Sequence, residues 1–156
     1  MEELIKEYGR GYRMLREAIE GLSEEELRYK PSPDKWSIHQ ILIHVADSEI
    51  LSTQRLKKVL SEDEPLLMSF DQDAWANGLG YDRLDREHHL LLFQLLRASM
   101  LPMLEQLTNE QGERVGVYPD AERFTFKELL EYRVDHVRGH LAQIERVRNA
   151  YRKSHE

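Results

Sequence analysis

The sequence predicts an all-α protein, a four-helix bundle with a long crossover connection. Four segments have helix length and carry apolar residues every three or four positions, the spacing of a helix with one buried face. Capping motifs precede two of these segments, and one link between them is far longer than most helix connections. The chain has 156 residues, the length of one domain with a substantial core, so a single domain is expected over residues 1–156.

The first helix is expected over residues 2–21. Apolar side chains recur there at intervals of three and four residues: Ile5, Tyr8, Tyr12, Leu15, Ile19 and Leu22. Gly9 and Gly11 lower the helix propensity of this segment only slightly. In the link that follows, Ser23 and Glu26 form a capping box that predicts a single helical turn, and two prolines after it prevent its continuation.

The second helix is expected from Ser37 to about Leu60. Ser37 and Gln40 form an S-x-x-Q capping box, in which each side chain bonds the backbone N–H of the other residue. The buried face of this helix is predicted to contain Ile38, Ile41, Leu42, Val45, Leu51, Leu56 and Val59. His44 borders that face.

Residues 61–84 form a link that is long for a compact bundle. One short helical turn is expected in it before Gly78. A helix of about 24 residues is about 36 Å long, and an extended link of this size spans that distance. The link is therefore expected to cross the molecule and to leave the second and third helices parallel.

The third helix is expected to begin after Asp85 and to reach Leu107. Its central part, Leu90–Leu104, is apolar on almost every side, which is typical of a buried helix. Pro102 is expected to kink it. No internal repeat or low-complexity tract interrupts this order of elements.

The fourth helix begins with a further capping box, formed by Thr125 and Glu128, and ends near Tyr151, where the sequence becomes charged. Between the third and fourth helices, Val115 and Val117 precede a Pro-Asp turn. This pattern predicts a small β-hairpin over part of the segment 108–124.

Composition excludes several classes of function. Lysine and arginine number 22 against 29 acidic residues, a net charge of −7, and no basic stripe with interleaved aromatic residues is present, so nucleic acid is not an expected partner. The chain has no cysteine, which excludes disulfides, thiolate metal sites and a cysteine nucleophile. The amino terminus lacks the apolar core of a signal peptide, and the longest apolar stretch, residues 89–96, is far too short to span a bilayer. No membrane association and a cytoplasmic location are therefore expected.

The placement of three histidines indicates a metal site. His136 and His140 form an H-x-x-x-H pair, and residues four apart on a helix lie on one face. Both flank the buried stripe of the fourth helix, as His44 flanks that of the second. Three imidazoles from two helices form a divalent metal site with an open coordination position, which is typical of a catalytic centre. From the residues alone, the alternative is that each histidine is a hydrogen-bonded side chain at the edge of a helix interface.

Two polar residues near these histidines are candidates for orienting a ligand imidazole. Asp47 lies one turn from His44, and Gln143 lies three residues beyond His140. The alternative is that both are ordinary solvated side chains. The other four histidines are expected at the surface or only lightly packed: His39, His88, His89 and His155.

Two sequence blocks resemble the signatures of the DinB-like (YfiT-type) superfamily. Trp36–Glu49, WSIHQILIHVADSE, is similar to its second-helix signature, and Asp135–Ile144, DHVRGHLAQI, is similar to its fourth-helix signature. Phe70–Trp75, FDQDAW, resembles the region before the third helix of that group. Length and helix order also match, so the resemblance covers essentially the whole chain.

The resemblance implies a four-helix bundle, frequently a homodimer, with a divalent metal held by His44, His136 and His140. Three imidazoles suit several divalent ions, with zinc and nickel expected first. The resemblance also implies that the metal holds a low-molecular-weight thiol, which is transferred to a small-molecule electrophile. The alternatives are a metal-dependent hydrolase and a non-catalytic bundle that binds metal only for stability. No catalytic residue beyond the metal ligands is assigned.

Overall fold

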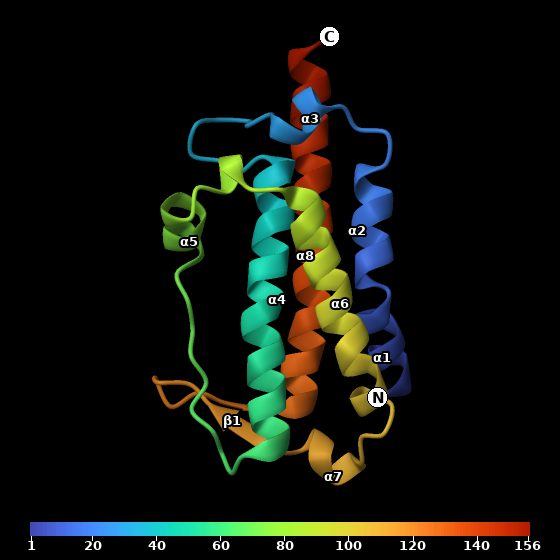
Figure 1. Ribbon diagram of the computed structural model, residues 1–156, viewed down its shortest axis with the longest axis vertical. Helices are drawn as coiled ribbons and strands as arrows, with labels where there is room; N and C mark the ends of the chain where they lie inside the picture. The colour runs from blue at the N-terminus through green and yellow to red at the C-terminus, as the bar shows by residue number, and fades with distance from the viewer.

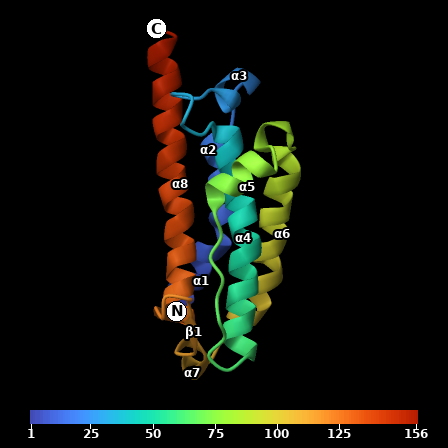
Figure 2. The same cartoon turned by 90° about the vertical axis from the view of Figure 1, so that its left-hand side faces the viewer.

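The computed structural model describes residues 1–156 and confirms the four-helix bundle (Figure 1). Its four rods are α1 (Glu2–Gly9) continued by α2 (Gly11–Ile19), α4 (Ile38–Ser61), α6 (Arg86–Leu104) and α8 (Phe126–Ser154). The shorter elements lie in the links: α3 (Glu24–Arg28), α5 (Gln72–Gly78), the 3-10 helix η1 (Tyr81–Arg83), α7 (Asn109–Gly112), β1 (Val115–Val117) and β2 (Arg123–Thr125). As predicted, α4 and α6 run in the same direction, whereas α8 and the α1–α2 rod run in the opposite one (Figures 1 and 2).

Capping boxes start α4, α8 and the short α3 where the sequence predicts them. Ser37 Oγ accepts a hydrogen bond from the Gln40 N–H at 3.2 Å, and Gln40 Oε1 accepts one from the Ser37 N–H at 2.9 Å. Thr125 and Glu128 form the same pair of bonds at the start of α8, and Ser23 caps α3 in the same way. These bonds satisfy N–H groups that have no partner within the helix, so the helix starts are determined locally.

The first rod is not the single helix predicted over residues 2–21. It is divided at Arg10, between α1 and α2. The backbone carbonyl of Tyr8 accepts a hydrogen bond at 2.8 Å from Nη1 of Arg97, a buried side chain of α6. A Cβ atom at Gly11 would lie 2.6 Å from the same nitrogen, so the glycine permits this close approach. A contact with a distant helix therefore accompanies the break, which apolar spacing does not reveal.

The long link runs back along α4, as Figures 1 and 2 show. Its first part pairs with the hairpin: the Leu67 N–H donates to the Val117 carbonyl at 2.7 Å, and the Val117 N–H donates to the Pro65 carbonyl at 2.9 Å. The predicted hairpin is present; it is antiparallel, with Val115 opposite Thr125, so its second strand extends one residue beyond the predicted segment. The last part of the link forms α5, the expected short helical turn, and η1. The link is thereby attached to the bundle at both ends.

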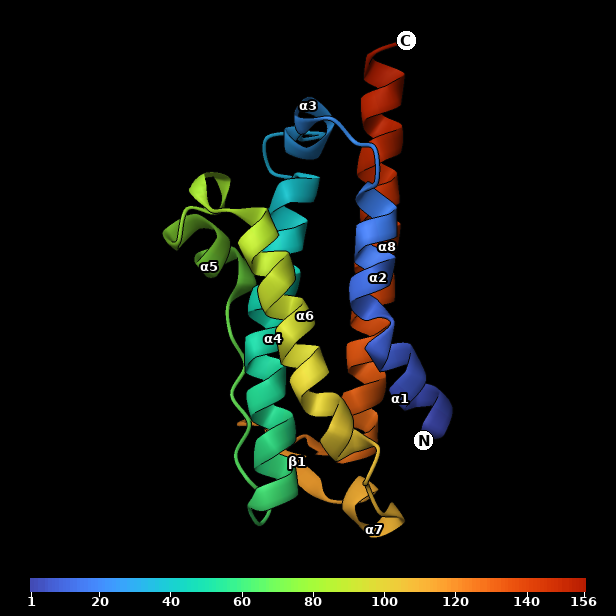
Figure 3. The same ribbon diagram turned by 45° about the vertical axis from the view of Figure 1, so that its right-hand side comes forward.

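The third rod, α6, is less buried than its composition predicts. Leu91 and Leu95 are 49% and 58% exposed, because only one face of the helix packs on the core. That face carries Leu90, Phe93, Arg97, Met100 and Leu104. The helix continues through Pro102 and ends at Leu104, short of the predicted end, and it lies alongside α4 (Figure 3). No helix combines the length and the apolar character needed to cross a bilayer.

Candidate metal centre

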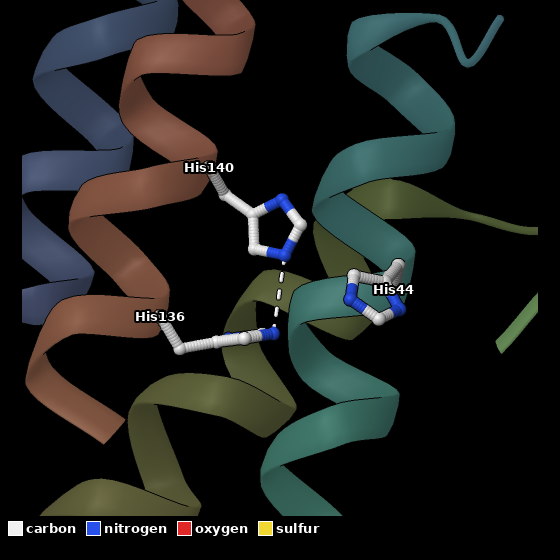
Figure 4. Close-up of side chains that lie close together, drawn as sticks. All are labelled: His44, His136 and His140. Carbon is white, nitrogen blue, oxygen red and sulfur yellow. Dashed lines mark hydrogen bonds between the residues drawn. The ribbon is translucent and has the colours of Figure 1, made fainter. Parts of the chain in front are cut away.

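The fold brings together the three histidines that the sequence singled out (Figure 4). His44 projects from α4, and His136 and His140 project from one face of α8. The ring centroids of His136 and His140 are 4.4 Å apart, and that of His44 lies 5.4 Å and 4.8 Å from them. One nitrogen from each ring lies within 4.8 Å of the others. The spacing along α8 aligns two of these rings, and the packing of α8 against α4 supplies the third.

Several ring nitrogens of this centre have no partner in the protein. Both ring nitrogens of His44 and Nδ1 of His136 are buried without a hydrogen bond. Nε2 of His136 faces Nε2 of His140 at 3.1 Å (Figure 4). Unpaired buried polar atoms cost free energy, and a divalent cation bound between the rings would accept one lone pair from each. The donor set therefore fits a divalent metal ion.

Burial keeps the three imidazoles neutral. Desolvation, with smaller contributions from His140 and Arg133, lowers the pKa of His44 to about 3. Desolvation also holds the pKa of His136 far below its ordinary value, and the charge of Arg133 acts in the same direction. The pKa of His140 is lowered chiefly by burial, against a hydrogen bond to Gln143 that raises it. Neutral imidazole is the form that donates a lone pair to a metal.

Of the two polar residues that could orient a histidine of the centre, only Gln143 contacts one. Its Oε1 lies 2.8 Å from Nδ1 of His140. Because an amide oxygen accepts, Nδ1 carries the proton and Nε2 keeps its lone pair for a metal. Asp47 makes no hydrogen bond with His44; its Oδ2 accepts one from the hydroxyl of Tyr81 at 2.6 Å instead. Asp47 thus anchors η1 to α4.

Aromatic side chains surround His44. The Trp36 ring centroid lies 4.9 Å from that of His44. The Phe70 ring stacks on the His44 ring, with the centroids 6.3 Å apart and an interplanar angle of 21°. Phe70 in turn packs edge-on against Trp75 at 4.9 Å. Because Phe70 and Trp75 belong to the segment between α4 and α6, the long crossover covers this side of the centre. These rings limit the access of bulk water to His44, which is 1% exposed.

His39 is not the surface residue that the sequence predicted. It is 1% exposed, with Nε2 at 2.9 Å from the Tyr81 carbonyl and Nδ1 at 3.2 Å from Nη1 of Arg86. An arginine only donates, so Nδ1 accepts and Nε2 carries the proton. Desolvation is the main cause that lowers the pKa of His39. The remaining histidines, His88, His89 and His155, lie outside the centre, as expected.

A buried charge network adjoins the centre, and sequence reasoning missed it. Glu49 is fully buried, and its carboxylate accepts hydrogen bonds from Arg97 Nη2 at 3.1 Å, Arg133 Nη2 at 3.0 Å and the Tyr8 hydroxyl at 3.2 Å. Burial raises the pKa of Glu49, but the two arginines outweigh it and leave that pKa below its usual value. Arg133 Nη1 also donates to Ser48 at 3.2 Å. The signal in the sequence was a charged residue at a position where the apolar spacing of each helix predicts burial: Glu49 in α4, Arg97 in α6 and Arg133 in α8.

A cleft of about 760 Å³ begins at His44 and His136 and follows α4 and α8 towards the hairpin. His44, Ser48 and Arg55 of α4 line one side, and residues of α8, including Arg133 and His136, line the other. Phe70 of the link and Tyr118 of the hairpin also border it. A metal at the centre would therefore face a cavity large enough for a small organic molecule.

The comparisons with known proteins agree with this geometry. The profile of the DinB superfamily matches residues 7–144. "Putative metal-dependent hydrolase YfiT" of Bacillus subtilis is 30% identical over 131 residues, 83% of this chain and 74% of that protein. A Bacillus licheniformis protein that bears the same description is 30% identical over 145 residues, 92% of this chain and 82% of its own.

The fold has a solved counterpart. The structure of Bacillus subtilis YfiT, described as a four-helix bundle of unusual topology, matches with a TM-score of 0.87 at 27% identity. The match covers 94% of this chain and 84% of that one. Sequence profile, relatives and structure therefore agree, and this chain belongs to the DinB superfamily.

Proposed function

We propose that this protein is a metal-dependent hydrolase whose divalent ion, zinc or nickel, is held by His44, His136 and His140. The observation that carries the proposal is the meeting of three neutral, largely buried imidazoles, with orphaned ring nitrogens, at one end of a large cleft. When bound with an open position, such an ion supplies a Lewis acid and a nucleophile at neutral pH. The relatives' descriptions support hydrolysis as the reaction class.

The protein's own groups have separate roles in this proposal. Gln143 holds the tautomer of His140, and Trp36 with Phe70 restricts water around His44. Arg133 lines the cleft. Arg133 and Arg97 together carry two positive charges against the one negative charge of Glu49. The excess positive charge favours negative charge that develops on a substrate at this end of the cleft.

Thiol transfer, which the resemblance implies, finds no support in the relatives' descriptions, which name hydrolases. No contact in the cleft selects a sulfur atom over an oxygen atom as the fourth donor. The thiol therefore enters only as one arm of the experiment. The effect of metal loss on folding distinguishes a catalytic metal from the non-catalytic alternative, in which the ion only stabilises the bundle.

The test is elemental analysis of the purified protein beside three variants, His44→Ala, His136→Ala and His140→Ala, with His88→Ala as a control outside the centre. We expect about one divalent ion per chain in the wild type and in the control, and little in the three variants, with helical circular dichroism retained. Hydrolysis of a panel of activated esters and amides should disappear with a chelator and return with metal.

Other results would redirect the proposal. Unfolding of the domain on metal removal would assign the ion a structural role. Conjugation of an electrophilic dye with small thiols, without any hydrolysis, would assign thiol transfer instead. Full metal content in all three histidine variants would place the ion elsewhere and end the proposal.

We also propose that the chain forms a homodimer through the exposed face of α6. Between residues 88 and 104 the only charged residue is Arg97, and it is buried. Two copies that each carry a charge of −7 repel one another, so an uncharged face is where a two-fold contact costs least. Leu91 and Leu95 project from that face and supply apolar area.

A further inference from the structure

Arg55 lines the same cleft as His44 and His136, towards its other end. His44 and Arg55 are both on α4, close to three full turns apart, which places them on one side of the helix and about 16 Å apart along its axis. Ser48 lies between them on that side, and all three side chains line the cleft. A molecule that extends from the histidines along α4 therefore reaches Arg55.

The guanidinium of Arg55 is held in place by the protein. Its Nε donates a hydrogen bond to the Met68 carbonyl at 2.8 Å, and its Nη2 donates to the same oxygen. The centroid of the Tyr118 ring lies 5.6 Å from the guanidinium carbon. Nη1 makes no hydrogen bond with the protein, and no carboxylate forms an ion pair with this side chain. Arg55 thus presents a positioned, unpaired positive charge with a free donor.

The other cation of the cleft has no such capacity. The terminal nitrogens of Arg133 already donate to Ser48 and Glu49, at 3.2 Å and 3.0 Å, and its Nε, which has no hydrogen-bond partner, is buried away from the cleft surface. An anion in the cleft would therefore find its free donor at Arg55. Because Arg55 is partly buried, a charge-assisted hydrogen bond there competes with less water than one at an exposed residue.

The rim of the cleft limits how much negative charge a ligand can carry. Five exposed carboxylates line it: Asp120, Glu122, Glu128, Glu131 and Asp135. Exposed charges are screened by water and salt, so they do not cancel the attraction of Arg55. Their repulsion is twice as large for a doubly charged phosphate as for a singly charged carboxylate. The carboxylate is the better match.

We propose that Arg55 binds a carboxylate of the substrate, at the end remote from the group that reacts at the three histidines. The substrate is then an elongated molecule with one carboxylate. About 16 Å separates His44 from Arg55 along α4, and the carboxylate lies closer to the reacting group than this because the arginine side chain extends towards it. This inference rests on the proposed function, because the metal centre defines the position of the reacting end.

Arg55 also attaches the link to α4 through the Met68 carbonyl, and a test must separate this structural role from ligand binding. Arg114 offers a matched control. Its Nε donates to the Val59 carbonyl at 2.7 Å and its Nη2 donates to the Glu62 carbonyl at 2.5 Å, so it also holds the start of the link, yet it does not line the cleft. Arg55→Gln and Arg114→Gln each remove one anchor, and only the first removes the charge from the cleft.

The experiment measures the binding of synthetic hydroxamates to the metal-loaded protein by calorimetry. A hydroxamate chelates the ion at one end, and a methylene spacer of increasing length carries either a carboxylate or an uncharged primary amide at the other. We expect one spacer length at which the wild type binds the carboxylate about tenfold more tightly than the amide. Arg55→Gln should lose this preference, Arg55→Lys should keep part of it, and Arg114→Gln should keep all of it.

The outcomes distinguish the two proposals. Binding of both series without a carboxylate preference, or a preference that survives Arg55→Gln, would overturn the role of Arg55 and leave the metal centre intact. A preference lost equally in Arg114→Gln would assign it to the order of the link and not to the charge. Failure of every hydroxamate to bind in a metal-dependent manner would remove the metal-bound end, and both proposals with it.

Discussion

At the scale of single residues, hydrogen bonds decide which ring nitrogen of a histidine can face a metal. Gln143 accepts from Nδ1 of His140, which leaves Nε2 directed at His136. His39 shows the converse case, since both of its nitrogens are used by the protein and none is left for a ligand. Histidine is therefore a candidate metal ligand at His44 and a structural side chain at His39, five residues earlier on α4.

Replacement of Gln143 by alanine should weaken the centre without removing a ligand. We expect metal affinity to fall about 10- to 100-fold, because His140 loses the partner that holds its tautomer and ring orientation. Competition with a chromophoric chelator measures this change. Gln94→Ala, at an exposed position of α6, is the control and should leave affinity unchanged. Equal affinities for wild type and Gln143→Ala would show that the hydrogen bond does not support the centre.

Glu49→Gln should destabilise the protein strongly. The change leaves the guanidiniums of Arg97 and Arg133 buried without a counter-charge, which costs about 3–5 kcal/mol in comparable buried pairs. Urea denaturation gives the free energy of unfolding, and Glu105→Gln, an exposed site, serves as the control. A loss below about 1 kcal/mol would mean that water or another residue compensates the arginines.

At the scale of elements, local sequence determines where most helices start but not where they break. The capping boxes at Ser37 and Thr125 use residues three positions apart, so the sequence alone predicts them. The division of the first rod has a different origin, because the Tyr8 carbonyl bonds Arg97 from α6. Helix propensity contains no information about that contact.

Gly11→Ala should destabilise the bundle although alanine is the better helix former. The new Cβ would lie 2.6 Å from Arg97 Nη1, and we expect a loss of about 1–3 kcal/mol from the strain. Gly139→Ala on α8 is the matched control, since its Cβ would meet nothing within 4 Å. That variant should gain about 0.5–1 kcal/mol. Stabilisation by both substitutions in thermal unfolding would show that Arg97 moves aside freely.

At the scale of the whole molecule, the crossover makes α4 and α6 parallel and carries Phe70 over His44. A short connection between these helices would make them antiparallel neighbours. The sequence predicts the length of the link and the parallel arrangement that follows from it. The sequence does not predict the path of the link over the metal centre, because that path depends on the pairing of the link with the hairpin and on the anchors at Arg55 and Arg114.

The uncharged face of α6 gives a prediction about assembly. Leu95→Glu places a charge at the centre of the proposed two-fold contact and should convert a dimer to a monomer. Size-exclusion chromatography with light scattering measures the mass. Leu79→Glu, at a leucine of similar exposure after α5, is the control and should leave the mass unchanged. A monomeric wild type, or a Leu95→Glu protein that remains dimeric, would place the interface elsewhere or remove it.

The number and order of the long helices, the capping residues, and the alignment of His136 with His140 on one face follow from the sequence, because each depends on residues within a few positions of one another. Four further features emerge from the folded chain: His44 meets that pair, His39 is buried, Arg10 divides the first rod, and Glu49 lies between two arginines. Each of these depends on contacts between helices far apart in the chain, where packing and the pairing of buried polar groups outweigh local propensity.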